Sequence, residues 1–224
     1  MKNISSRFPG NKTYWLPNGA DLDYFKNEKD DGWRKQNGFS ENDFLLLYAG
    51  IIGHAQGLEI ILNAAEQLKE HAAMKWLIVG NGPKKESLLK MKNEKGLSNV
   101  FFYDVLPKEK IPSLISSSDA AVIPLKKLDL FKGAIPSKIF ENSAMGKPLL
   151  LGVEGEAKDL FIDTAKAGLF FMPEDEKDLA RQALILYNNR GLCRELGENG
   201  CRYVKENFSR DQIAENFNNI LLSV

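Results

Sequence analysis

The segment Lys132–Glu141, with the sequence KGAIPSKIFE, places an ammonium and a carboxylate three residues apart at the start of a helical pattern. This pattern predicts a helix over 136–145, because a Pro-Ser pair opens it and Gly146 follows it. The free N–H groups at such a helix start suit a diphosphate, and Lys138 adds positive charge there. One turn later, the Glu141 carboxylate could accept hydrogen bonds from two adjacent ribose hydroxyls. The spacing alone fits equally well a solvated Lys–Glu pair, which stabilises a helix by only about 0.2–0.5 kcal/mol.

The glycine-rich segment Gly50–Gly57 follows a predicted strand and precedes a predicted helix. Its three glycines permit positive φ angles and a close approach of the backbone to a ligand, and the helix start beyond it offers N–H groups to an anion. The segment does not match the G-x-G-x-x-G pattern, and no acidic residue ends the next strand to hold an adenosine ribose. These departures disfavour a nicotinamide-dependent oxidoreductase. A glycine-rich turn without a ligand is the alternative for this segment.

Short apolar runs alternate with amphipathic segments from residue 44 to the end of the chain. Such runs are typical of strands buried on both faces, and helices are expected between them. The predicted fold class is therefore α/β, with a doubly wound, parallel, six-stranded Rossmann-like sheet in the order 3-2-1-4-5-6. The expected strands are 44–49, 76–79, 100–103, 120–123, 149–151 and 169–171, and the expected helices are 58–68, 84–95, 108–117, 136–145, 157–165, 176–189, 191–206 and 211–222.

In such a sheet a ligand binds outside the carboxyl ends of the strands, at the point where the strand order reverses. Here that point is a crevice between the ends of the first and fourth strands. The loops 50–57 and 125–136 border the crevice, and the loops 80–83 and 103–107 lie beside it. The turn 80–83, Gly-Asn-Gly-Pro, suits a purely structural role as well as a ligand contact, because the same residues are good turn formers.

The composition excludes several classes of protein. Among 224 residues, 30 Lys and Arg balance 30 Asp and Glu, which removes a whole-protein attraction to nucleic acid or to an anionic membrane. Two cysteines (Cys193 and Cys201) and two histidines (His54 and His71) predict neither a disulfide framework nor a metal site. No apolar run approaches the ~20 residues of a membrane-spanning helix, and the first residues carry no signal peptide pattern. We therefore expect a cytoplasmic protein that binds no nucleic acid.

Several short stretches, in a fixed order over residues 17–224, carry a resemblance to one family: Pro17–Asp21, Tyr48–Gly50, Gln56–Leu58, Leu77–Pro83, Asn99–Phe102, Ser118–Ala120, Pro136–Glu141, Ala144–Pro148, Gly168-Leu169 and Phe208-Ser209. With them the sequence resembles the C-terminal domain of retaining glycosyltransferases with the two-Rossmann-domain GT-B architecture, of the family 4 type (glycosyl transferases group 1). That domain binds the donor, a nucleoside-diphosphate sugar.

The resemblance implies roles for individual residues. Glu141 matches the second glutamate of the family's E-x7-E signature, which holds the donor ribose. The loop before it matches the backbone that cradles the diphosphate and faces the donor sugar, and a loop after the third strand meets the nucleobase through main-chain groups. No catalytic residue is identified. The expected donor-nucleotide contacts are Glu141, Lys138, Ser137, Gly133, Ala134, Ile135, Gly53, Gln56, Val105, Leu106 and Asn81.

Three positions depart from the family pattern. The first signature glutamate would stand at Gly133, the usual arginine after the first strand is Ile51, and the usual phosphate lysine is Gln56. Because a diphosphate needs counter-charge, Lys138 or Lys132 should replace the missing cations, with helix N–H groups supplying the rest. The Gln-Gly-Leu loop, paired with Pro-Ser-Lys, resembles a subgroup that transfers amino-deoxy sugars in surface-polysaccharide assembly.

The resemblance also implies that an N-terminal, acceptor-binding domain is absent. Residues 1–16 would be a leader or linker and 17–224 the donor-binding domain, and excision from a longer protein is favoured over a natural half-protein. The last helix would normally pack toward the other domain, so we expect its apolar residues Ile213, Phe217, Ile220 and Leu221 to be exposed.

The expected activity of the full-length protein is transfer of a hexosyl or amino sugar from a UDP-linked donor to a lipid-linked or saccharide acceptor, with no cofactor and no metal. Peripheral association with the inner face of the membrane would fit such an acceptor, and this chain alone should be inactive. Two alternatives stay open. One is half of a sugar-nucleotide 2-epimerase, for which His54 is thin support. The other is a non-catalytic nucleotide-sugar-binding domain, which would fit Gly133, Ile51 and Gln56.

Overall fold

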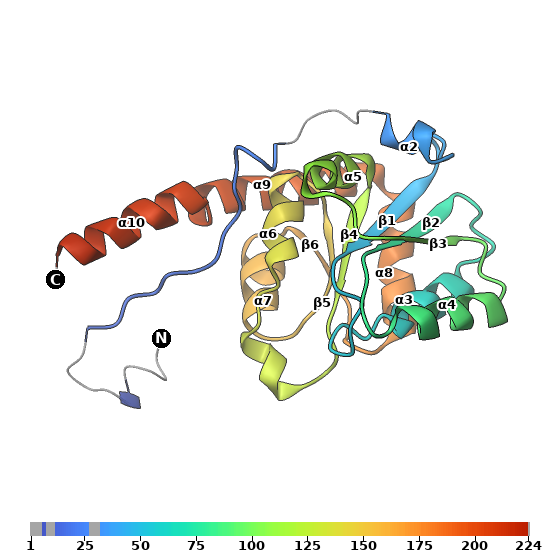
Figure 1. Ribbon diagram of the computed structural model, residues 1–224, viewed down its shortest axis with the longest axis horizontal. Helices are drawn as coiled ribbons and strands as arrows, with labels where there is room; N and C mark the ends of the chain where they lie inside the picture. Colours follow the sequence, from blue (N-terminus) through green and yellow to red (C-terminus); the bar gives the residue numbers. More distant parts are fainter. Residues whose placement is uncertain (1–5, 8–11, 27–31, 224) are drawn as a thin grey trace.

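A six-stranded parallel sheet forms the centre of the molecule (Figure 1). The structure, a computed structural model, describes residues 6–7, 12–26 and 32–223. The strand order β3-β2-β1-β4-β5-β6 confirms the predicted doubly wound topology, and all neighbouring strands are parallel. The strands are β1 (Phe44–Ala49), β2 (Met74–Val79), β3 (Val100–Tyr103), β4 (Ala120–Pro124), β5 (Leu149–Gly152) and β6 (Gly168–Phe170).

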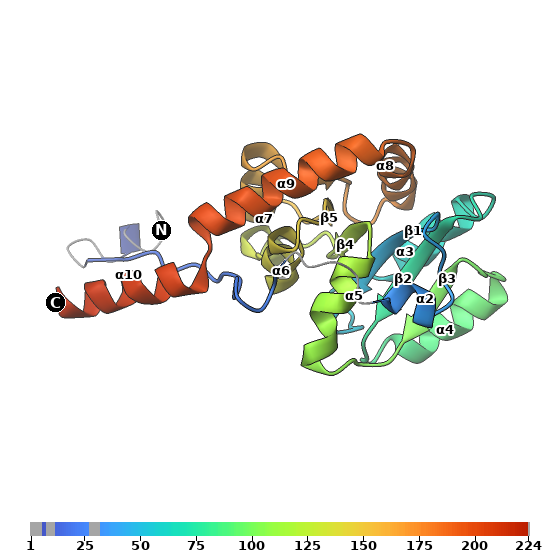
Figure 2. The ribbon, with the colours of Figure 1, turned by 90° about the horizontal axis from the view of Figure 1, so that it is seen from above.

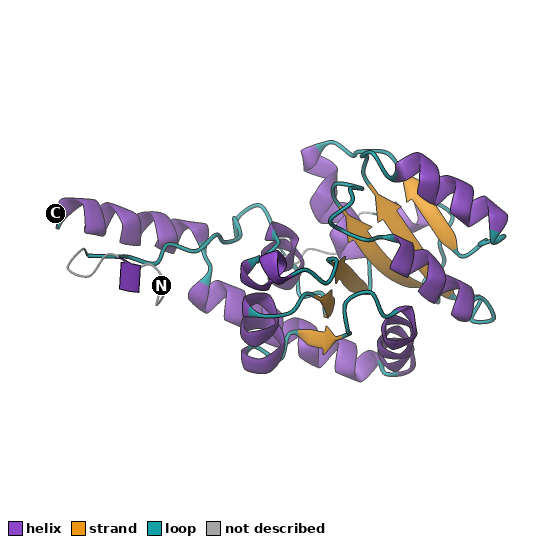
Figure 3. Cartoon of the chain, turned by 90° about the horizontal axis from the view of Figure 1, so that it is seen from below, coloured by secondary structure: helices purple, strands orange, loops and turns teal. Residues whose placement is uncertain are grey.

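Helices cover both faces of the sheet (Figure 3), because strand side chains alternate between two apolar clusters. In β1, Phe44, Leu46 and Tyr48 belong to one cluster, while Leu45 and Leu47 belong to the other. The helices are α2 (Trp33–Gln36), α3 (Glu59–Gln67), α4 (Lys85–Glu94), α5 (Ile111–Ser117), α6 (Ser137–Ala144), α7 (Glu156–Lys158), α8 (Glu176–Asn188), α9 (Arg190–Asn207) and α10 (Arg210–Leu222), with 3₁₀ turns η1 (Lys108–Lys110) and η2 (Asp129–Gly133) and a π-helical turn η3 (Asp159–Thr164).

The predicted elements are confirmed, and some boundaries differ. The helix predicted over 108–117 divides into η1 and α5, because Pro112 has no N–H with which to continue the preceding turn. The helix predicted over 157–165 is α7 continued by η3. Pro136 caps α6 and is not its first helical residue, while Gly146 ends that helix with φ +68°, as the pattern predicted.

Asp119 ties several elements together at the amino edge of the sheet. Its carboxylate accepts hydrogen bonds from the Leu45 backbone N–H at 2.7 Å, from Arg34 at 2.6 Å and from Arg190 at 2.7 Å. Arg34 also donates from Nε to the Ser117 carbonyl at 2.6 Å, which explains why this arginine is buried. Charges can be buried when they are paired and hydrogen-bonded in this way. The network therefore fixes α2 and α9 against β1 and β4, at the edge away from the crevice.

Helix α10 leaves the body of the molecule and runs beside the segment 12–19 (Figures 1 and 2). The two meet where Arg210 Nε donates to the Gly19 carbonyl at 3.1 Å. The prediction of exposed apolar residues on this helix is confirmed for two of the four: Phe217 and Leu221 are exposed, whereas Ile213 and Ile220 are half-buried.

The loops after β1 and β2 meet through their backbones. A Cβ at Gly80 would lie 1.9 Å from the Gly50 carbonyl oxygen, and a Cβ at Gly82 would lie 2.4 Å from the Ile52 carbonyl oxygen. Both glycines have positive φ angles, +143° and +154°. Because both the contact and the dihedral exclude a side chain, these two positions require glycine. The turn 80–83 therefore has the structural role that was one of its two predicted possibilities.

We predict that Gly80→Ala destabilises the protein more than Gly96→Ala. Gly96 has φ +61° but open space at its Cβ position, so its substitution measures the dihedral cost alone, roughly 1–2 kcal/mol. Gly80→Ala adds a collision with backbone that cannot move without separating the two loops. Urea unfolding of both variants gives the comparison. Equal losses in the free energy of unfolding would show that the two loops are free to move apart.

Candidate functional site

A pocket of about 330 Å³ opens at the carboxyl ends of β1, β2 and β3. Its lining combines exposed backbone with apolar side chains, and Glu141 is the one ionisable residue among the described residues that line it. Such a lining suits a flat apolar group attached to a group that carries hydroxyls. The lining residues are Ala49, Gly50, Ile51, Val79, Gly80, Asn81, Val105, Leu106, Ile111 and Glu141.

Glu141 reaches this pocket from the middle of α6. Its neighbours Phe140 and Asn142 are buried in the protein, so the sequence of the helix turns Glu141 toward the crevice. Burial raises the pKa of the Glu141 carboxyl, and the positive charges of Lys138, Arg210 and Lys108 oppose that increase. A half-buried carboxylate in this setting gains from ligand donors such as a pair of hydroxyls.

The ammonium of Lys138 lies against Tyr48 and Gly50, between the start of α6 and the end of β1. We call this position the crevice floor. Lys138 Nζ lies 4.3 Å from the centre of the Tyr48 ring, donates a hydrogen bond to Tyr48 Oη at 3.3 Å, and lies 2.8 Å from where a Cβ of Gly50 would stand. Within the described part of the chain, no carboxylate lies within ion-pair distance (4.0 Å) of this ammonium. Burial lowers the pKa of Lys138 to about 8, against the smaller opposing effect of Glu141. The alternative of a solvated Lys–Glu pair is therefore wrong.

The start of α6 adds backbone donors beside Lys138. Pro136 stands at the cap position, and no side chain caps the helix there. The Ile139 N–H donates to the Pro136 carbonyl at 3.0 Å. The backbone N–H groups that precede Ile139 at the helix start have no acceptor within the helix and face the loop. An ammonium next to an uncapped helix start is an arrangement that suits an anion.

The structure brings together some of the predicted contacts and separates others. Asn81, Val105, Leu106 and Glu141 line one pocket, and Lys138 lies beside it. Gly53 and Gln56 form a neighbouring turn, in which Gln56 Oε1 lies 2.7 Å from the position of a Cβ on Gly53. The remaining predicted contacts, Gly133, Ala134, Ile135 and Ser137, do not line the pocket and form the segment that leads from η2 into α6.

The segment before α6 distinguishes the two candidate lysines. Lys132 is exposed and pairs with Asp129 at 2.7 Å, an ion pair that raises the pKa of Lys132. Lys138 is the one of the two that lies at the crevice floor. At Gly133 no heavy atom lies within 4 Å of a Cβ position, so the structure has space there for the side chain of the glutamate that the family pattern predicts.

Sequence reasoning missed two residues that shape the pocket. The apolar pattern places Tyr48 in a buried strand but gives no role to its hydroxyl group, which needs a hydrogen-bond partner when it is buried. Lys85, on α4, pairs with Asp104 at 2.6 Å and donates to the Gly80 carbonyl at 3.2 Å, which holds the loop after β3 against the loop after β2. The spacing of Lys85 and Asp104 in the sequence gave no indication of this pairing.

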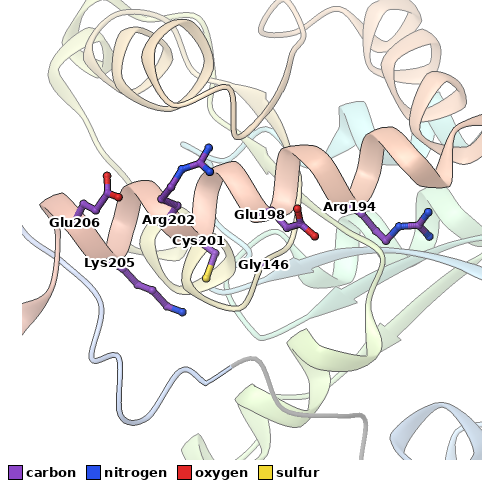
Figure 4. A pocket seen from close by; sticks show the side chains of 7 residues that line it. All are labelled: Gly146, Arg194, Glu198, Cys201, Arg202, Lys205 and Glu206. Carbon is purple, nitrogen blue, oxygen red and sulfur yellow. The ribbon is translucent and has the colours of Figure 1, made fainter.

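A larger groove of about 530 Å³ lies along α9 and is a weaker candidate (Figure 4). Its charged side chains come from one helix and carry both signs, and Gly146 places it toward the amino edge of the sheet. The lining residues are Gly146, Arg194, Glu198, Cys201, Arg202, Lys205 and Glu206.

The described residues also contain no cluster of three or more His, Cys, Asp or Glu side chains that could hold a metal ion. His54 is exposed and does not line the pocket at the crevice.

Comparisons with known proteins identify the family of this chain. Residues 29–203 match the model of the family described as glycosyl transferases group 1. A relative from Escherichia coli, a colanic acid biosynthesis glycosyl transferase named WcaI, is 28% identical over 88% of this chain and 50% of its own length. This chain thus spans about half the length of that relative.

Solved structures agree in fold. Sucrose-phosphate synthase from Thermosynechococcus elongatus matches 99% of this chain and 55% of its own with a TM-score of 0.84 and 20% identity. HepE from Anabaena, solved in complex with UDP-glucose, matches 96% of this chain and 59% of its own with a TM-score of 0.82 and 20% identity. Since the family model matches most of the sequence, the chain belongs to the glycosyl transferases group 1 family.

Proposed function

We propose that this chain is the donor-binding domain of a glycosyltransferase and that its crevice binds a UDP-linked sugar. The observation that carries the proposal is an apolar pocket that contains one carboxylate, beside a helix start where the half-buried ammonium of Lys138 has no carboxylate partner within the described residues. A nucleoside diphosphate has the matching order of groups: a flat base, a ribose with two hydroxyls, and a doubly charged phosphate chain.

In this proposal each part of the donor has a partner in the chain. The base lies against the loop that contains Val105 and Leu106, and the ribose hydroxyls donate to Glu141. The diphosphate lies between the start of α6 and Lys138, so that the sugar extends toward Gly133. Negative charge grows on the diphosphate as its bond to the sugar breaks, and a fixed ammonium and fixed backbone N–H groups stabilise that charge without reorganisation.

The wider role is proposed from the relatives. WcaI is named for colanic acid biosynthesis, and another relative, 27% identical, is named O-antigen chain mannosyltransferase C. We therefore propose transfer to a lipid-linked or saccharide acceptor in surface-polysaccharide biosynthesis, with a second domain closing the crevice. Retention of configuration and an amino-deoxy sugar as the donor group are proposed from the resemblance of the Gln-Gly-Leu and Pro-Ser-Lys segments. Of the helices in the described ranges, none has the length and apolar character required to cross a bilayer. We also propose that the full-length protein associates peripherally with the membrane.

A non-catalytic nucleotide-sugar-binding domain is the second candidate. It is favoured by Ile51, Gln56 and Gly133, which carry no charge at positions where the resemblance predicts charged groups. Both candidates predict donor binding, so titration tests them together. Assay of sugar transfer by this chain joined to a second, acceptor-binding domain separates them, because only the enzyme would release UDP in an acceptor-dependent manner.

The first prediction concerns the ribose. Glu141→Gln should weaken UDP binding by about 1.5–3 kcal/mol, because a charge-assisted hydrogen bond is lost. The same substitution should weaken the binding of uridine by the same free energy, since uridine carries the same ribose. Isothermal titration calorimetry measures both ligands, and Glu206→Gln, on the exposed face of α9, serves as the matched control that should bind like the wild type. Absence of UDP binding to the wild type at millimolar concentration would refute the proposal, and an unchanged affinity in Glu141→Gln would refute the ribose contact.

The second prediction concerns pH. Because burial lowers the pKa of Lys138 in the free protein to about 8, the ammonium predominates at pH 7, is half present near pH 8 and is lost at higher pH. Bound diphosphate favours the ammonium, so UDP affinity should fall about twofold between pH 7 and 8 and then by up to about tenfold per pH unit toward pH 10. Lys138→Met should bind UDP weakly with little dependence on pH over this range. Lys90→Met, at an exposed position of α4, should keep the wild-type profile. A wild-type profile as flat as that of Lys138→Met would exclude Lys138 from the diphosphate site.

A further inference from the structure

Tyr48 is a polar residue in an otherwise apolar strand, and its position in the fold is unusual. It belongs to β1, whose sequence is FLLLYA, and 1% of its surface is exposed. A tyrosine hydroxyl in such a place requires hydrogen-bond partners, because a lone buried hydroxyl is costly. The structure supplies two partners, and both belong to the crevice.

The Tyr48 hydroxyl group acts in two directions. It donates its proton to the Ile51 carbonyl at 2.5 Å and accepts a hydrogen bond from Lys138 Nζ at 3.3 Å. Burial raises the pKa of the tyrosine, so the hydroxyl keeps the proton that it donates to the Ile51 carbonyl. The oxygen lone pairs are then left for Lys138, and the direction of the Lys138–Tyr48 hydrogen bond is fixed.

The Tyr48 ring provides a second constraint on the same ammonium. Lys138 Nζ lies over the ring face, 4.3 Å from its centre. On another side, Lys138 Nζ lies 2.8 Å from the Cβ position of Gly50, a residue that lines the pocket. A lysine side chain has a flexible four-carbon stem and loses considerable entropy when it is held in one position. The ring and the hydroxyl of Tyr48 hold the ammonium at the crevice floor, and the absence of a side chain at Gly50 leaves space for it there.

We infer that Tyr48 is a positioning residue of the donor site, which holds the Lys138 ammonium and the Ile51 carbonyl in one arrangement so that the cation faces the diphosphate of the donor. The inference rests on the proposed function. It also accounts for a cation in a crevice where Ile51 and Gln56 provide none.

The test compares ligands with and without phosphates. UDP and uridine are titrated calorimetrically at pH 7 into the wild type, Tyr48→Phe, Tyr48→Leu, Lys138→Met and the double variant Tyr48→Phe/Lys138→Met. Tyr48→Leu removes ring and hydroxyl and should weaken UDP binding roughly tenfold, in the range of a lost cation–π contact. Tyr48→Phe keeps the ring but loses both hydrogen bonds of the hydroxyl, and should weaken UDP binding about threefold. Uridine affinity should change less than about twofold in both variants.

The double variant keeps the inference testable if Tyr48→Leu does not fold. A residue that acts through Lys138 has no further effect once that lysine is gone, so Tyr48→Phe/Lys138→Met should bind UDP as Lys138→Met does. Equal losses for UDP and uridine, or additive losses in the double variant, would overturn the positioning role while leaving the donor site intact. Failure of the wild type to bind UDP would overturn both this inference and the proposed function.

Discussion

The contact between the loops after β1 and β2 sets the shape of the crevice on which the other features of the site depend. The Gly80 backbone lies so close to the Gly50 carbonyl that no side chain can stand between them, and Gly82 repeats the contact at Ile52. The Gly80 N–H is in turn bound to the Tyr103 carbonyl, so the loops after three neighbouring strands are connected through the backbone. This connection determines where the pocket opens. It also places Gly50 where the ammonium of Lys138 can approach it, since a Cβ at Gly50 would lie 2.8 Å from Nζ and would displace it.

Charge in this protein is distributed differently at the two edges of the sheet. At the amino edge, Asp119 is paired with both Arg34 and Arg190 and accepts from a backbone N–H, so its charge is compensated within the protein. At the carboxyl edge, Lys138 has a ring and a hydroxyl as partners, and burial lowers its pKa because these neutral partners do not replace the lost water. The first arrangement stabilises the fold. The second leaves free energy to be gained when an anion binds, which is the property expected of a binding site.

The sequence sufficed to predict the sheet, its strand order and the edge at which the pocket opens. The pocket lies over the ends of β1, β2 and β3, however, and not between the ends of the first and fourth strands as predicted. The correct predictions depend on short apolar runs and on right-handed crossovers, and both are properties of the chain that other residues rarely override. The depth of Lys138 could not be predicted, because the spacing to Glu141 is the same for a solvated pair and for two residues facing a crevice. The role of Tyr48 was also out of reach, since it requires knowing that α6 returns to the end of β1, ninety residues away along the chain. The ion pair of Lys85 and Asp104 could not be predicted for the same reason, because the register of β2 and β3 brings the two residues together and the local sequence does not encode that register.

The uncharged residues Ile51 and Gln56 change the physics of the site rather than only weakening it. The resemblance predicts two cations on the loop after β1, where water would screen them and where side chains can move. Here the side-chain cation at the crevice floor is Lys138, which is partly desolvated and held against an aromatic ring. A desolvated ammonium interacts more strongly with an anion than an exposed one does, because the local dielectric constant is lower. The same desolvation brings its pKa toward the working pH. The strength of anion binding and its dependence on pH thus have one origin. A crevice that relies on a half-buried lysine cannot bind an anion more strongly without also becoming more sensitive to pH.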